Sequence, residues 1–81
     1  MSKLKCVLVR ESDNSPIQVG ESLKTFRGEK VTLMGWKFPY NPQDNLIVGG
    51  KIYCQAKGQT YQDQWFPHVC RLKFILVPDL A

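Results

Sequence analysis

Histidine is almost absent from this sequence, cysteine is sparse, and long apolar runs are missing. There is one histidine, His68, and none of the three cysteines forms a CxxC pair. The longest apolar run, residues 74–78, is far shorter than the roughly 20 residues that a membrane-spanning helix needs, and no apolar signal stretch opens the chain. We therefore expect a cytoplasmic protein with reduced thiols and no disulfide.

The scarcity of these residue types also argues against a metal site, a cofactor and an enzyme. His68 and the three cysteines, Cys6, Cys54 and Cys70, lack the paired spacing of structural zinc sites. Cys70 and His68 could in principle act as nucleophile and base, but the alternation of Cys70 with Leu72 predicts a buried, inert thiol. We expect no catalytic residue, no metal and no cofactor.

The size and composition indicate one folded unit. The chain has 81 residues, of which 43% are hydrophobic and 22% charged, as is typical of globular domains. This length suffices for one core and is too short for two, so residues 1–81 are expected to form a single domain. The net charge of +4 favours anionic partners only mildly, because the basic residues are spread along the whole chain.

Apolar and polar side chains alternate with a period of two, which predicts strands, and no apolar period of 3.6 residues runs for three turns. In the segment 30–37, Val31 and Leu33 are expected to face the core. The segment 38–50 breaks the pattern with prolines, asparagines and paired glycines, which indicates a long loop. The expected strands cover residues 3–10, 23–26, 30–37, 51–56, 60–66 and 70–77, with one helical turn at His68 and Val69.

The turn segments between these strands resemble those of SH3-like barrels. Residues 19–23, 27–31 and 65–69 carry the resemblance, and the last of these segments, with Pro67, precedes the final strand. Short strands in so small a chain are most economically closed into a barrel, which hides their edges. The expected fold is therefore all-β, a single small SH3-like barrel of five or six short antiparallel strands.

A second resemblance is to small uncharacterised bacteriophage proteins, including those of phages that infect marine cyanobacteria. Its motifs are Phe26-Arg27-Gly28-Glu29, Gly35-Trp36, Pro39 and Gly50-Lys51-Ile52-Tyr53, within residues 17–76. The resemblance implies a phage-encoded protein in the host cytoplasm without an assigned activity, so no functional residue carries over. The sequence departs from peptide-binding SH3 domains proper, because it lacks the paired aromatics of their first loop and the acidic cluster of their second.

Aromatic and basic residues, most of them on or beside the segment 38–50, are the candidate binding residues. Aromatic rings can stack on peptides, bases or cations, and lysine and arginine can contact anions. The residues selected on these grounds are Trp36, Phe38, Tyr40, Tyr53, Arg27, Lys37 and Lys51.

These residues predict an interaction module that binds a protein partner around the segment 38–50. One alternative is a weak, sequence-tolerant nucleic-acid-binding domain, in which Trp36 and Tyr53 stack bases. Its phosphate contacts would come from Arg27, Lys30, Lys37 and Lys51. Another alternative is a structural subunit that forms oligomers through exposed strand edges. No membrane partner is expected.

Overall fold

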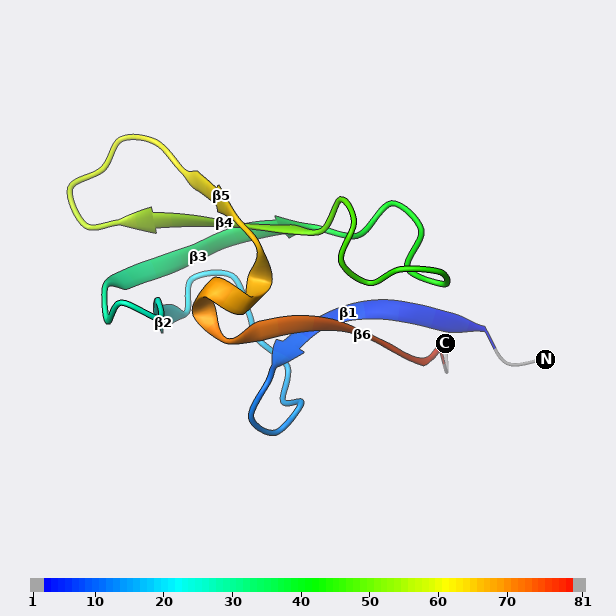
Figure 1. Cartoon of the computed structure of the whole chain (residues 1–81). Helices are drawn as coiled ribbons and strands as arrows, with labels where there is room; N and C mark the ends of the chain where they lie inside the picture. The colour runs from blue at the N-terminus through cyan, green and yellow to red at the C-terminus, as the bar shows by residue number, and fades with distance from the viewer. Residues whose placement is uncertain (1–2, 80–81) are drawn as a thin grey trace.

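The computed structural model describes residues 3–79, which form six strands and one short 3-10 helix (Figure 1). The all-β prediction is confirmed, and the predicted helical turn at His68 and Val69 lies inside the 3-10 helix. Within residues 3–79 no helix is long and apolar enough to cross a membrane. The elements are β1 (Leu4–Arg10), β2 (Ser22–Lys24), β3 (Lys30–Lys37), β4 (Lys51–Ala56), β5 (Asp63–Trp65), η1 (Pro67–Cys70) and β6 (Leu72–Pro78).

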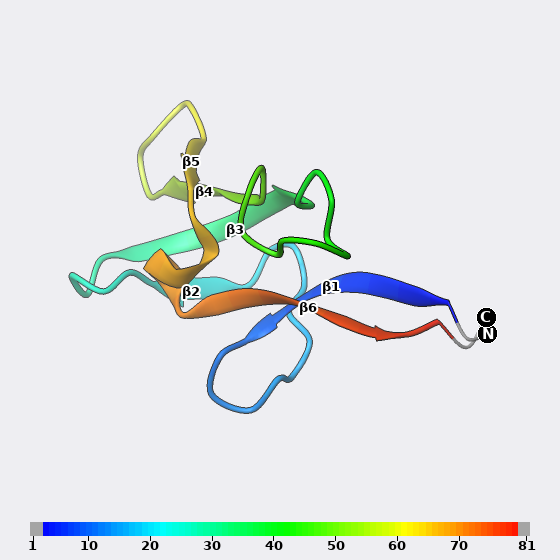
Figure 2. The ribbon, with the colours of Figure 1, turned by 45° about the vertical axis from the view of Figure 1, so that its right-hand side comes forward.

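The strands form two open antiparallel sheets instead of the predicted closed barrel (Figures 1 and 2). One sheet is the ribbon of β1 and β6, and the other has the strand order β2-β3-β4-β5. Closure needs a continuous ladder, but the edge strands β2 and β5 have only three residues each. The strand expected over 23–26 ends early because the Thr25 hydroxyl accepts the N–H groups of Arg27 and Glu29, at 3.2 Å each, and starts a turn.

The strand expected over residues 60–66 is also shorter than predicted. The Gln59 side chain accepts the N–H of Ala56 at 2.9 Å, and the Gln59 carbonyl accepts the Gln55 amide at 2.6 Å. These bonds close the turn after β4, so that pairing with β5 resumes only at Asp63. The short edge strands thus follow from local side-chain bonds, which compete with the sheet ladder.

The two sheets share one apolar core. Leu33, Ile52 and Cys54 of the larger sheet are completely buried, as is Leu72 of the ribbon. The predicted inward orientation of Val31 and Leu33 is confirmed. The core is completed by Leu8, Ile17, Val31, Cys70 and Phe74. Because the inner faces of both sheets are buried in this core, the outer face of the four-stranded sheet is open to solvent.

A bulge in β3 changes which side chains face the core. The register against β4 shifts between Leu33 and Gly35, so that Met34 is an extra residue. Strict alternation would place Trp36 on the face opposite to Leu33. With the bulge, Trp36 pairs with the buried Ile52 and packs against the core.

Candidate functional site

The loop of residues 38–50 is held in one shape by its own polar groups. The side-chain oxygen of Asn45 accepts the N–H groups of Ile47 and Val48, at 2.8 and 3.1 Å. The N–H of Tyr40 donates to the carbonyl of Val48 at 3.1 Å, which closes the loop across its base. The segment without a predicted strand therefore has internal hydrogen bonds of its own.

Two glycines let aromatic rings lie directly on the loop backbone. An added Cβ at Gly49, whose φ is +85°, would lie 2.6 Å from the Tyr40 ring. At the buried Gly50 it would lie 2.8 Å from the Phe74 ring. These distances are far inside van der Waals contact, so both positions require glycine, and the Phe74 ring packs the loop against β6.

The loop exposes four large apolar or aromatic side chains. The residues concerned are Phe38, Tyr40, Ile47 and Val48, with exposed fractions of 46%, 72%, 69% and 55%. Grouped exposed apolar side chains mark interaction sites more often than isolated ones do. The prediction that partner contacts lie around residues 38–50 therefore has a physical basis in the folded chain.

A groove of about 400 Å³ lies between this loop and the segment that enters η1. Its walls are apolar except for two charged side chains, Glu11 and Lys73, and the imidazole of His68. The loop contributes Leu46 and Ile47 to one wall. The remaining lining residues are Phe66, Pro67 and Leu72.

Four of the predicted site residues lie together at the loop end of β3. The Phe38 ring contacts Trp36 edge-on, with centroids 6.5 Å apart, and Phe74 at 5.8 Å. The ammonium group of Lys37 lies 4.7 Å from the centre of the Tyr40 ring. Phe38 and Trp36 thus extend the core outwards, whereas Tyr40 and Lys37 remain at the surface.

The other three predicted residues lie elsewhere. Lys51 is paired with Lys37 in the sheet, but its ammonium group lies 3.4 Å from the centre of the Phe66 ring. Tyr53 lies on the outer face of the sheet. Arg27 is in the turn between β2 and β3, at the opposite end of β3 from the loop. There its guanidinium carbon lies 5.5 Å from the centre of the Phe26 ring.

Sequence reasoning missed the residues that line the groove. Leu46, Ile47, Phe66 and His68 were not among the predicted binding residues, although all four border the groove. A signal was present in the sequence: three branched apolar residues, 46–48, stand between Asn45 and two glycines. Branched apolar residues inside a turn-rich segment have no strand to bury them, so they reach the surface.

The cysteines and the histidine lie in contrasting environments. The Cys54 and Cys70 thiols are buried. The pKa of Cys54 is raised, mainly by the hydrogen bond with Cys70 and in addition by burial. Burial also raises the pKa of Cys6. The exposed His68 ring stacks on Phe66 at 5.9 Å, so Cys70 and His68 do not share one environment. Among residues 3–79, no three histidine, cysteine or acidic side chains gather as a metal site would require.

No protein-family model, curated protein or solved structure matches this chain. The candidate site is therefore defined by its geometry alone. That geometry comprises a loop with internal hydrogen bonds, a group of exposed apolar side chains, and an apolar groove beside η1.

Proposed function

We propose that this protein is a non-enzymatic interaction module that binds an extended apolar segment of a protein partner. The segment lies in the groove between the loop 38–50 and η1. The observation that carries the proposal is the apolar lining of the groove, whose wall residue Ile47 is 69% exposed in the free protein. Burying such a side chain on binding contributes about 1.5–3 kcal/mol, which is enough to make it an anchor.

The charges at the groove define the chemistry of the partner segment. Lys73 lines the groove and the ammonium group of Lys51 lies over the Phe66 ring, while Glu11 is the one acidic residue among the described residues of the lining. A carboxylate beside the apolar anchor of the partner would face Lys73 and complement the net charge of +4. We therefore favour an apolar segment with an acidic residue over the basic, proline-rich ligands of peptide-binding SH3 domains.

The order of elements supports an SH3-like architecture as part of the same proposal. The last strand, β6, follows the proline-containing turn η1 and pairs with β1, so the two ends of the described chain lie in one ribbon. The loop 38–50 and η1 approach each other beside this ribbon. The phage-encoded origin and the location in the host cytoplasm stay predictions.

The test is a selection of peptides by the purified protein from a random display library, followed by titration of the enriched peptides. The key variant is Ile47→Glu, which places a charge in the groove wall. Its control is Val19→Glu, because Val19 is also exposed, at 58%, but does not line the groove. We expect enriched peptides with an apolar anchor and a nearby carboxylate, and at least tenfold weaker binding by Ile47→Glu alone.

Two results would contradict the proposal. One is the absence of any enriched peptide, and the other is equal binding by the two variants. A light-scattering mass measured on the same samples addresses the alternative of a structural subunit. Each strand of the ribbon has seven residues and pairs along one edge only in the described chain, so its other edge could pair with a second molecule. Oligomers that form in this way would appear as a multiple of the 9.3 kDa chain mass.

A further inference from the structure

The outer face of the four-stranded sheet carries cations without carboxylates. Residues directly opposite each other in a ladder share a face, so the buried pair Leu33 and Cys54 marks the inner face. The strand residues assigned to the outer face include no aspartate or glutamate. They are Ser22, Lys24, Lys30, Thr32, Gly35, Lys37, Lys51, Tyr53, Gln55 and Gln64.

Lysines oppose each other at both ends of this face. Lys24 is the direct cross-strand partner of Lys30, and Lys37 is the partner of Lys51. Like charges directly opposite in a sheet are destabilising, so a bound anion would relieve the repulsion at each end. Lys37 and Lys51 also lie over aromatic rings, which limits the freedom that their side chains would lose on binding.

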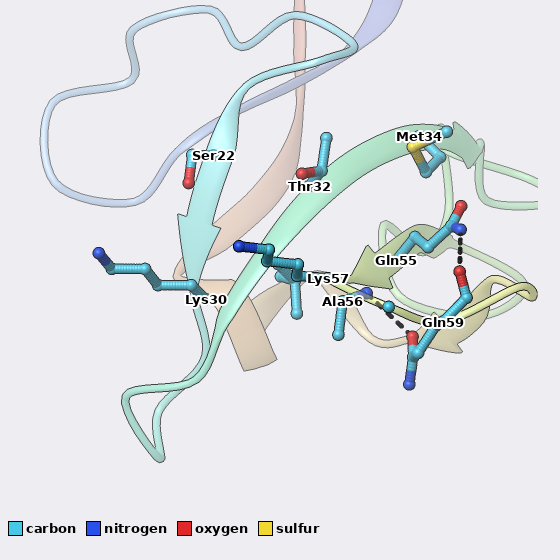
Figure 3. Close-up of a pocket in the computed structure, with 10 residues that line it drawn as sticks. Ser22, Lys30, Thr32, Met34, Gln55, Ala56, Lys57 and Gln59 are labelled. Atoms are coloured by element: carbon cyan, nitrogen blue, oxygen red, sulfur yellow. Dashed lines mark hydrogen bonds between the residues drawn. The ribbon is translucent and has the colours of Figure 1, made fainter.

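A hollow of about 500 Å³ opens on the same face (Figure 3). It is lined by hydroxyl and amide side chains, among them Ser22, Thr32 and Gln55, and by Lys30 and Lys57. In Figure 3 the two lysine side chains extend to the same side of the sheet. Among the described residues 3–79, no acidic side chain lines the hollow, so its polar groups suit an anionic ligand.

An aromatic ring lies at the centre of the face. Tyr53 pairs with Gly35, and a Cβ at Gly35 would lie 3.6 Å from Cδ2 of the Tyr53 ring. The ring therefore extends over the one residue of β3 that has no side chain. A flat ring between two groups of lysines is the arrangement on which an unpaired base can stack while its phosphates meet cations.

We propose that this outer face binds single-stranded nucleic acid, with Tyr53 as the stacking platform and the lysines as phosphate contacts. The eight residues of β3 span roughly 23 Å, which accommodates about four nucleotides, the lower end of known site sizes. A single strand fits better than a duplex, because paired bases hide the planes that would stack on Tyr53. The proposal does not rest on the groove, whose lining it does not use.

The experiment is fluorescence anisotropy of a labelled oligothymidylate, titrated with the full chain over a range of salt concentrations. We expect saturable binding at low salt, with log K falling against log salt by about 0.7 per phosphate neutralised. The double variant Lys30→Gln/Lys57→Gln should reduce this slope by about 1.4. The control double variant Lys3→Gln/Lys5→Gln removes the same charge at the start of the β1–β6 ribbon, outside the face, and should leave the slope unchanged.

Stacking is tested separately. Tyr53→Leu should weaken binding by about 5- to 150-fold without changing the salt slope, and Tyr53→Phe should retain the wild-type affinity. Tyr61→Leu, at an exposed ring in the turn after β4, is the matched control. The proposal is overturned by an absence of saturable binding, by equal slopes for the two double variants, or by equally tight binding of a duplex. Circular dichroism confirms that each variant is folded, and Tyr53→Phe keeps the test decisive if Tyr53→Leu unfolds.

Discussion

The ammonium group of Lys51 lies 3.4 Å from the centre of the Phe66 ring. This contact joins β4 to the residue that enters η1, and the Phe66 ring also stacks on His68. Phe66 also lines the groove. One cation therefore links the basic outer face of the sheet to the apolar groove, and it fixes the ring on which the groove wall depends.

Removing the charge of Lys51 should destabilise the fold measurably. Lys51→Gln loses the contact with Phe66, and the free energy of unfolding should fall by about 0.5–2 kcal/mol. Lys51→Arg, which keeps the cation, should stay within about 0.5 kcal/mol of wild type. Urea denaturation measures both values. Lys57→Gln, at an exposed lysine in the turn after β4, is the control, and an equal loss in Lys57→Gln would contradict this interpretation.

A single methyl group at Gly50 should disturb the loop. In Gly50→Ala the new Cβ would meet the Phe74 ring at 2.8 Å and Pro39 at 3.2 Å, in a buried position. We expect a loss of about 1–3 kcal/mol in the free energy of unfolding. Gly35→Ala is the matched control, because its Cβ would lie at an ordinary 3.6 Å from Tyr53. Equal stability of the two variants in thermal or urea unfolding would show that the ring does not pack on the loop.

The three thiols should differ in reactivity. Cys6 is half-buried, whereas Cys54 and Cys70 are buried in the core. With a chromogenic disulfide reagent at pH 8, we expect Cys6 to react first in the folded protein. The other two should react only as fast as the chain unfolds, and all three should react in urea. Mass spectrometry after partial labelling assigns the sites, and early labelling of Cys70 would contradict the burial described here.

Stability should fall at high pH, in part because of Cys6. Burial raises the pKa of this thiol in the folded state above the ordinary 9.0. The unfolded chain therefore loses this proton more readily, so the contribution to stability is complete below about pH 9 and is lost as the pH rises through the folded pKa. In Cys6→Ala, the free energy of unfolding should decline less steeply between pH 8 and 10.5. Parallel pH curves for wild type and variant would exclude this effect.

Much of the fold follows from the alternation of side chains, and the exceptions have local causes. The predicted bounds of β3 and β4 are confirmed, because Val31 and Leu33 in β3 and Ile52 and Cys54 in β4 alternate with more exposed residues and are buried. The predicted last strand begins two residues late, since Cys70 closes η1 and Arg71 adopts a left-handed conformation with φ of 58°. The prediction of a closed barrel was wrong because hydrogen bonds of the Thr25 and Gln59 side chains shorten the edge strands. The alternation of apolar and polar residues gives no information about such bonds.

The candidate site was less predictable than the fold. The alternation of apolar and polar residues in the sequence does not reveal the bulge at Met34. This bulge moves Trp36 to the inner face of the sheet, so that Tyr53 is the aromatic residue on the outer faces of the paired strands. The shape of the loop depends on rings that pack on Gly49 and Gly50, and Phe74 is distant from both in the sequence. Contacts of this kind exist only after the chain has folded, so the groove could not be assembled from neighbouring residues.

The groove between the loop 38–50 and η1 is tested most directly by isotope-filtered nuclear Overhauser measurements on the labelled protein with an unlabelled peptide from the display selection. Intermolecular signals are expected from the peptide to the methyl groups of Leu46 and Ile47 and to the ring protons of Phe66. Signals confined to the β1–β6 ribbon or to the outer face of the four-stranded sheet would contradict the proposed binding site.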